Sequence, residues 1–89
     1  MKHFIYEVGI EIDEKNSDDF LSYNIGSTAF LESFSFKEEA INCAKEYSKK
    51  YSDSKIFVDR WISIPEEDLY DLDESFEAII INGGKNENI

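Results

Sequence analysis

Carboxylates are the side chains of this sequence whose type and spacing could do chemistry, and they gather in two runs. Residues 7–19 hold six acids and one base, and residues 66–77 hold seven acids and no base. Alternate residues of a strand lie about 6.6 Å apart, so outward carboxylates at that spacing could imitate a nucleic-acid backbone. A basic groove that binds phosphates would then bind this protein instead. The alternative is that both runs are solvated loops.

Residues of both runs are therefore predicted to contact a basic partner. They are Glu66, Glu67, Asp68, Asp71, Asp73 and Glu74 of the second run, and Glu11, Asp13, Glu14, Asp18 and Asp19 of the first. Aromatic residues dominate the energetics of many interfaces, and Tyr70, Phe57 and Trp61 lie near the second run. For Phe57 and Trp61, however, we expect packing in the core.

Groups for catalysis are scarce. His3 is the single histidine, and no motif places an oriented base or nucleophile beside it. Cys43, the single cysteine, lies on the apolar stripe of a predicted helix, where a buried thiol is inert. We therefore expect a protein that is not an enzyme and has no catalytic residue.

Metal and cofactor motifs are scarce as well. One His and one Cys do not make a structural zinc site, and no acidic stretch has the Gly and Glu offsets of a calcium loop. The pair Gly83-Gly84 follows the last predicted strand and opens no helix, unlike a phosphate-binding loop. We predict neither a metal nor a cofactor.

The composition indicates a single globular domain with a strong negative charge. The chain has 89 residues, 42% of them hydrophobic, and its net charge is -11 from twenty acids and nine bases. Such a field repels nucleic acid and anionic membranes and attracts basic proteins. We expect a basic protein partner, with no direct contact to nucleic acid or membrane. Solubility is the alternative role of the charge.

The expected location is the cytoplasm, either of the producing cell or of an infected one. A single cysteine permits no internal disulfide, which fits a reducing compartment. Glu7 interrupts the apolar start before a secretory signal can form. The longest apolar runs, such as 78–81, are too short to span a membrane.

Three segments have the pattern of strands. Residues 4–12 alternate between apolar and polar side chains, and this period of two predicts a half-buried strand with Val8 and Ile10 facing the core. Residues 56–64 are apolar on both faces, which indicates a central strand or one whose second face meets a partner. Pro65 should end that strand, and residues 76–81 should form the last one.

The segment 20–36 permits two interpretations. Alternation at 21–25, a turn at Gly26-Ser27 and apolar residues from Thr28 onward predict a hairpin. The alternative is a short helix that begins at Ser17 with acids in its first turn.

Residues 36–51 have the periodicity of a helix. An apolar stripe runs from Phe36 through Ala40 and Ala44, and charged residues cover the opposite side. Ser35 and Glu38 have the spacing of a capping box, in which Ser35 is the N-cap. The last turn is basic, as the helix dipole favours.

The remaining segments complete the predicted architecture. Residues 65–75 should form a short helix with Leu69 and Leu72 facing inward, or an acidic hairpin loop. The predicted fold class is α+β, with one antiparallel-leaning sheet of about four or five strands packed on one main helix, in the order β-β-β-α-β-(short helix or loop)-β. Residues 1–82 form the single domain, and 83–89 are a disordered polar tail.

The stretch 34–46, with its Glu38-Glu39-Ala40 helix opening, and the order of elements resemble the N-terminal domain of HicB-type antitoxins. That domain has three strands followed by a helix, and the resemblance implies the same order here. It covers roughly a third of the chain, and the family's Gly-Cys turn is replaced by Ser33 and Phe34. In size and charge the chain is also similar to phage counter-defence inhibitors, nucleic-acid mimics and toxin-immunity proteins.

These observations predict a small acidic protein that binds and inhibits a basic protein. An anti-CRISPR-like or DNA-mimic phage protein that occupies the nucleic-acid-binding surface of an enzyme would act in this way. One alternative is an immunity protein or antitoxin that neutralises a cognate toxin. Another is a structural module that self-associates, for example as a homodimer through an edge strand at 78–81.

Overall fold

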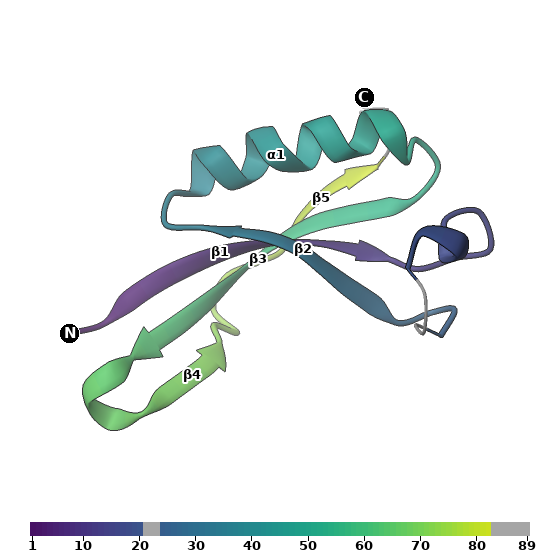
Figure 1. The fold of residues 1–89 in the computed structure, drawn as a ribbon. Coiled ribbons are helices and arrows are strands. Elements are labelled where there is room, and N and C mark those ends of the chain that lie inside the picture. The colour runs from purple at the N-terminus through teal and green to yellow at the C-terminus, as the bar shows by residue number, and fades with distance from the viewer. Residues whose placement is uncertain (21–23, 83–89) are drawn as a thin grey trace.

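The computed structural model describes residues 1–20 and 24–82 of the chain (Figure 1). Its elements are β1 (His3–Glu11), the 3-10 turn η1 (Ser17–Asp19), β2 (Thr28–Phe34), α1 (Lys37–Lys50), β3 (Lys55–Ile64), the 3-10 turn η2 (Pro65–Glu67), β4 (Leu69–Leu72) and β5 (Ile79–Asn82). The strands form one open antiparallel sheet, and α1 packs on one face of it. The predicted α+β class is confirmed.

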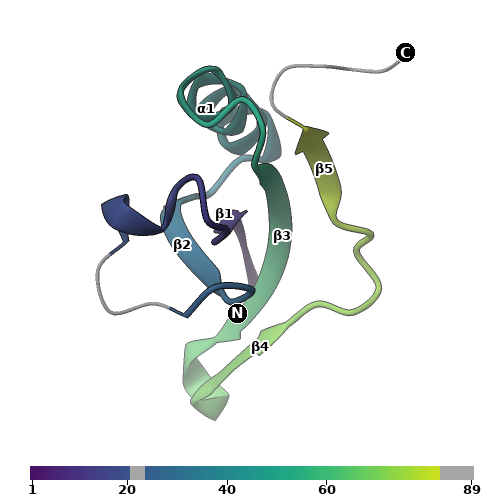
Figure 2. The same cartoon turned by 90° about the vertical axis from the view of Figure 1, so that its right-hand side faces the viewer.

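The long strand β3 organises the sheet, whose order is β2-β1-β3-β4 with β5 also on β3. One edge of β3 pairs with β1, and its other edge is divided between two short strands. β4 pairs with residues 61–64 and β5 with residues 55–58, so the two follow each other along one side of β3 (Figure 2). β3 is therefore central, as its apolar residues on both faces predicted.

The core lies between α1 and one face of the sheet. Alternation puts Val8 and Ile10 of β1, and Ile12 directly after it, on this face, and all three are buried. The other buried apolar residues are Ala29, Ala40, Ala44, Ile56, Val58 and Ile81. Burial of each large aliphatic side chain contributes about 1.5–3 kcal/mol. The predicted strand at 4–12 is confirmed to within one residue at each end, and its inward face is confirmed at Val8 and Ile10 but not at Phe4, which is exposed.

The helix α1 matches its prediction to within one residue at each end. Ala40, Ala44 and Ser48 are its buried residues, and their small size lets the helix axis lie close to the sheet. The capping box is wrong, because the N-cap residue is Phe36 and makes no side-chain cap. Phe36 is also 66% exposed rather than part of the buried stripe. Within the described residues, no helix is long and apolar enough to cross a membrane.

The second half of the predicted hairpin within 20–36 is confirmed. β2 forms as expected, whereas Ile25 lies in a turn and residues 21–23 lie outside the described part of the chain. Ser17–Asp19 forms the 3-10 turn η1, which agrees with the alternative of a helical start there. Gly26 has a φ of 93°, and its N–H donates to the carbonyl of Ile12. The described part of the chain therefore has two strands before α1, where three were predicted.

The segment after Pro65 is a hairpin. Pro65 ends β3 as predicted, η2 makes the turn, and Asp68 adopts a left-handed conformation with a φ of 53°. The helix that begins at Pro65 is limited to η2, and the extended strand β4 after it turns Leu72 away from α1, so the predicted inward placement of Leu72 is wrong. The last strand begins at Ile79 rather than at residue 76. The predicted disordered tail at 83–89 lies outside the described residues.

Candidate functional site

The sheet face opposite α1 carries large apolar side chains that no described helix covers. Side chains alternate across a sheet, so the odd residues of β1 and β3 lie on this face. It is termed the open face, and its apolar residues are Ile5, Phe30, Phe57, Trp61, Tyr70, Leu72 and Ile80. Phe30 and Tyr70 are 53% and 52% exposed, and Leu72 and Ile80 are 43% and 45% exposed. Such clustered apolar exposure is typical of an interaction surface.

Aromatic rings cross the open face in a connected row. The Trp61 ring stacks on Tyr70, with centroids 5.2 Å apart, and meets Phe30 edge-on at 6.2 Å. The Phe57 ring covers Gly9, where a Cβ would lie 2.7 Å from the ring, so only glycine leaves room for it. The indole Nε1–H of Trp61 is shielded from solvent and has no hydrogen-bond partner among the described residues. These contacts hold the rings in place without removing them from the surface.

Two acidic side chains lie among these rings. Glu7 of β1 and Asp59 of β3 are direct cross-strand neighbours and both are half-buried. Burial raises the pKa of the Glu7 carboxyl, and the nearby Asp59 raises it further. Burial also raises the pKa of Asp59, although Lys55 on the same face opposes this. Like charges placed opposite each other destabilise a sheet.

The opposite face of β3 holds a different kind of carboxylate. Asp73 is 7% exposed, and its Oδ2 accepts a hydrogen bond from Nε of Arg60 at 2.8 Å and forms an ion pair with Nη2 of Arg60 at 2.7 Å. Its Oδ1 accepts from the N–H and hydroxyl of Ser75, at 3.0 and 2.6 Å. The Arg60 guanidinium also lies 4.4 Å from the Phe4 ring and 4.9 Å from the Phe76 ring. The hydrogen bond from the Ser75 hydroxyl lowers the pKa of Asp73 most, and the hydrogen bond from Arg60 lowers it further. This cluster joins the β4–β5 connection to β3.

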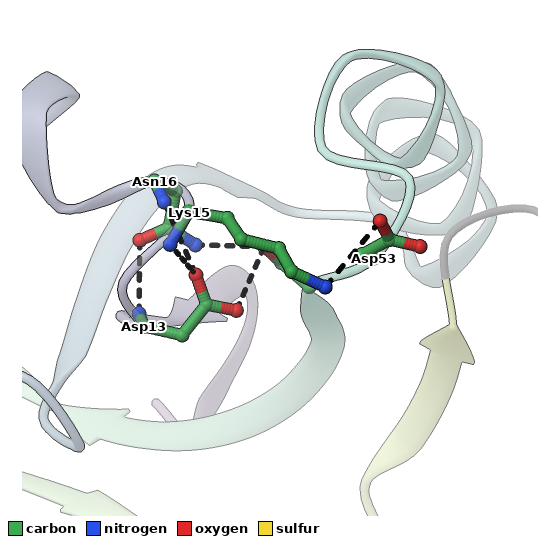
Figure 3. A network of polar contacts seen from close by, with 5 residues as sticks. Asp13, Lys15, Asn16 and Asp53 are labelled. Atoms are coloured by element: carbon green, nitrogen blue, oxygen red, sulfur yellow. Dashed lines mark hydrogen bonds and ion pairs between the residues drawn. The ribbon is translucent and has the colours of Figure 1, made fainter.

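One residue of the first acidic run belongs to a structural network. Asp13 accepts hydrogen bonds from the backbone N–H groups of Lys15 and Asn16 and from the Ser54 hydroxyl. The buried Asn16 side chain donates to Ser54 at 2.7 Å. Figure 3 shows these contacts and the exposed ion pair of Lys15 with Asp53. The network fastens the β1–η1 loop to the turn before β3.

The other predicted residues of this run are exposed. Glu11 ends β1 on the open face, where it lines a shallow pocket with Phe57 and Ile80. Glu14 and Asp18 lie on the loop and η1, and Asp19 accepts a hydrogen bond from the Tyr51 hydroxyl at 2.9 Å.

The second run follows the β3–β4 hairpin. Glu66 and Glu67 lie on η2 and Asp68 follows them, all exposed, and Glu66 pairs with the N-terminal amine of Met1. Asp71 is exposed on β4 opposite Ile62. Glu74 is exposed in the following loop.

The exposed acids of the loop after β1 and those of the β3–β4 hairpin therefore lie at opposite ends of the sheet. β1 and β3 are antiparallel, so the end of β1 lies beside the start of β3 and far from the hairpin (Figure 1). The open face lies between the two ends, and Phe57 and Trp61 belong to it rather than to the core, which corrects their predicted packing. Period-two alternation could have assigned Glu7 and Asp59 to such a face, but only the pairing of β1 with β3 makes them neighbours.

The residues considered for catalysis do not form a reactive group. Burial, with a contribution from Glu32, raises the pKa of the half-buried Cys43 thiol to about 11, so it is protonated at neutral pH. A protonated thiol is a poor nucleophile. His3 is exposed at the start of β1. The chemistry that the open face supports best is recognition through apolar contact and charge.

No known protein family, curated protein or solved structure matches this chain.

Proposed function

We propose that this protein is a small inhibitor that binds a basic protein in the cytoplasm and occupies its nucleic-acid-binding surface. The observation that carries the proposal is the open face, where exposed apolar side chains share one sheet face with a carboxylate pair, and exposed acids lie at both ends of the sheet. An apolar centre with a polar rim is the usual anatomy of a protein interface.

Charge supports a basic target. At a net charge of -11 the protein repels nucleic acid and attracts surfaces that bind phosphates. Exposed acids at the ends of the sheet, such as Glu66 and Glu67 at one end and Glu14 at the other, would speed encounter with such a surface. Apolar contacts at the centre would then slow dissociation.

A capture experiment tests this function. Tagged protein is incubated with a lysate of the host at low salt, and proteins released by high salt are identified by mass spectrometry. We expect a basic nucleic-acid-binding protein whose binding to nucleic acid is inhibited by the purified chain. The triple variant Glu66→Lys, Glu67→Lys, Asp68→Lys should lower the association rate roughly tenfold. Capture of no basic protein, or of one whose activity is unaffected, would contradict the proposal.

Self-association is the second candidate, because an edge strand favours it. Within the described residues β5 pairs only with β3, and its Ile80 is exposed. An open edge can pair with a second copy. Sedimentation at low and high salt tests this function: a dimer that persists at high salt supports it, and a monomer at both contradicts it.

A further inference from the structure

The open face contains an electrostatic imbalance that the folded chain does not resolve. Glu7 and Asp59 oppose each other across β1 and β3, and neither accepts a hydrogen bond from a described residue. Lys55 lies on the same face, two residues before Phe57 in the sequence, and its positive charge partly offsets the rise in the pKa of Asp59. A partly buried carboxylate pair of this kind is stabilised by a cation that arrives from outside.

The surroundings of the pair select the kind of cation. Tyr70 lies on the same open face as Glu7, and burial, followed by the charge of Glu7, raises the pKa of its phenol. The Trp61 ring stacks on Tyr70, and Leu72 is the cross-strand neighbour of Trp61. Aromatic faces attract ammonium and guanidinium groups, and apolar surfaces bind the methylene stems of Lys and Arg. A cationic side chain with an apolar stem fits both features.

Other occupants of this face fit less well. A second copy would bring its own Glu7 and Asp59 and a further net charge of -11, so like charges would meet at the centre. Nucleic acid is repelled by the same charge. A purely apolar partner would bury two carboxylates without a counter-charge, which is costly. Charge complementarity therefore selects a basic segment of a protein.

We propose that Glu7 and Asp59 receive a Lys or Arg side chain of a target protein, whose apolar flanking residues pack on Trp61, Tyr70 and Leu72. This proposal rests on the proposed function in that it names the centre of the binding face and the chemistry of the residue that enters it. The acidic ends of the sheet then steer the target, and the open face holds it.

Trp61 allows a direct test, because it is the single tryptophan of the chain. The full chain is titrated with the peptide acetyl-Leu-Arg-Leu-Arg-Leu-amide, and tryptophan emission is recorded. The matched probe has citrulline, which is uncharged and nearly isosteric, at both arginine positions. We expect a saturable emission change with the arginine peptide at a Kd on the order of 1 mM or below. The citrulline peptide should bind at least about tenfold more weakly.

The variant Glu7→Gln with Asp59→Asn should also weaken the arginine peptide at least about tenfold. Its control is Glu38→Gln with Glu39→Gln, which changes the net charge equally on the exposed first turn of α1, across the sheet. The control should leave the Kd within about twofold, as expected for screened distant charges. Equal binding of the two peptides, equal effects of the two variants, or no emission change would overturn the proposal.

The experiments distinguish a failure of the Glu7–Asp59 site from a failure of the proposed inhibitor function. Suppose a basic target is captured and inhibited, and Glu7→Gln with Asp59→Asn leaves its affinity unchanged while charge reversal on η2 abolishes binding. The function would then stand and the carboxylate pair would be overturned as its centre. If the arginine peptide binds as expected and no basic protein is captured, the site is supported and the proposed inhibitor is not.

Discussion

Asp59 and Arg60 are adjacent on β3, and their side chains enter two opposite electrostatic environments. On one face, Arg60 binds Asp73, whose oxygens also accept from Ser75. On the other face, Asp59 opposes Glu7, and no described residue donates to either carboxylate. The pKa of Asp73 is lowered, whereas the pKa values of Glu7 and Asp59 are raised.

The comparison separates acids that stabilise the fold from acids that act against it. Ionised Asp73 has donors for both oxygens, so its charge contributes to folding. Ionised Glu7 and Asp59 repel each other in a half-buried setting, so their charges reduce stability. An external cation would therefore stabilise ionised Glu7 and Asp59, whereas the charge of Asp73 is already balanced within the fold.

The largest expected effect is at the internally paired site. Asp73→Asn removes the charge that balances Arg60 and weakens the join between β3 and the β4–β5 connection, so the Tm should fall by roughly 10 °C at neutral pH. Circular dichroism during heating measures it. Asp71→Asn is the control, since Asp71 is exposed two residues earlier and makes the same charge change. Equal shifts in the two variants would show that the Arg60 pair contributes nothing particular.

At the open face, removing a carboxylate charge is expected to stabilise the fold rather than destabilise it. Glu7→Gln removes one of two opposed charges and keeps the shape of the side chain, so the free energy of unfolding should rise by up to about 1 kcal/mol at neutral pH. Urea unfolding measures this change. Adding Asp59→Asn to Glu7→Gln should raise the free energy of unfolding by less than the first substitution did, because the repulsion between the two carboxylates is already relieved.

The control for this gain is Glu11→Gln, an exposed position on the same strand and face. It should leave the free energy of unfolding nearly unchanged. Destabilisation by Glu7→Gln would mean that the ionised Glu7 has a favourable partner, and the contrast between the two sites would be lost.

The elements could be predicted from the sequence where local spacing determines them. The alternation at 4–12 is enough for β1, and small residues such as Ala40 and Ala44 at helical spacing are enough for α1. The start of α1 was misplaced relative to Ser35, because a capping pattern does not by itself fix which residue adopts the extended N-cap conformation.

The candidate site was harder to predict from the sequence than the elements, because it depends on which strands are neighbours in the sheet. In sequence Asp73 is one more acid of the second run, and only the position of the β4–β5 connection against Arg60, thirteen residues earlier, makes it internal. Glu7 and Asp59 are 52 residues apart and meet only through the register of β1 with β3. Such long-range pairing is not encoded in the period of either strand.

Acid titration should distinguish the two sites by sign. The pKa values of Glu7 and Asp59 in the folded chain lie above their ordinary values of 4.5 and 3.8. Their destabilising effect is therefore present above the raised pKa values and disappears as the pH falls through them. The gain from Glu7→Gln should shrink as the pH falls through the raised pKa of Glu7 toward its ordinary value of 4.5.

Asp73 should behave in the opposite way, because its pKa is lowered below 3.8. Its stabilisation is complete above that ordinary value and is lost as the pH falls through the lowered one. Between the ordinary values of 4.5 for Glu7 and 3.8 for Asp73, the loss caused by Asp73→Asn should remain while the gain from Glu7→Gln has largely gone. Parallel changes of both variants with pH would contradict the assignment of opposite pKa shifts.

The smallest expected effect is at an exposed ion pair, which provides a third environment. Lys49 and Glu46 on α1 are 3.2 Å apart, with side chains 72% and 73% exposed. Glu46→Gln should lower the free energy of unfolding by no more than about 0.5 kcal/mol, and salt should reduce the change further. Urea unfolding of Glu46→Gln and of Glu7→Gln compares the free energies of unfolding of two variants that have the same net charge. If both variants stabilise the chain equally, relief of the net charge of -11 controls stability. Opposite signs would instead show that the local surroundings of each carboxylate decide its effect.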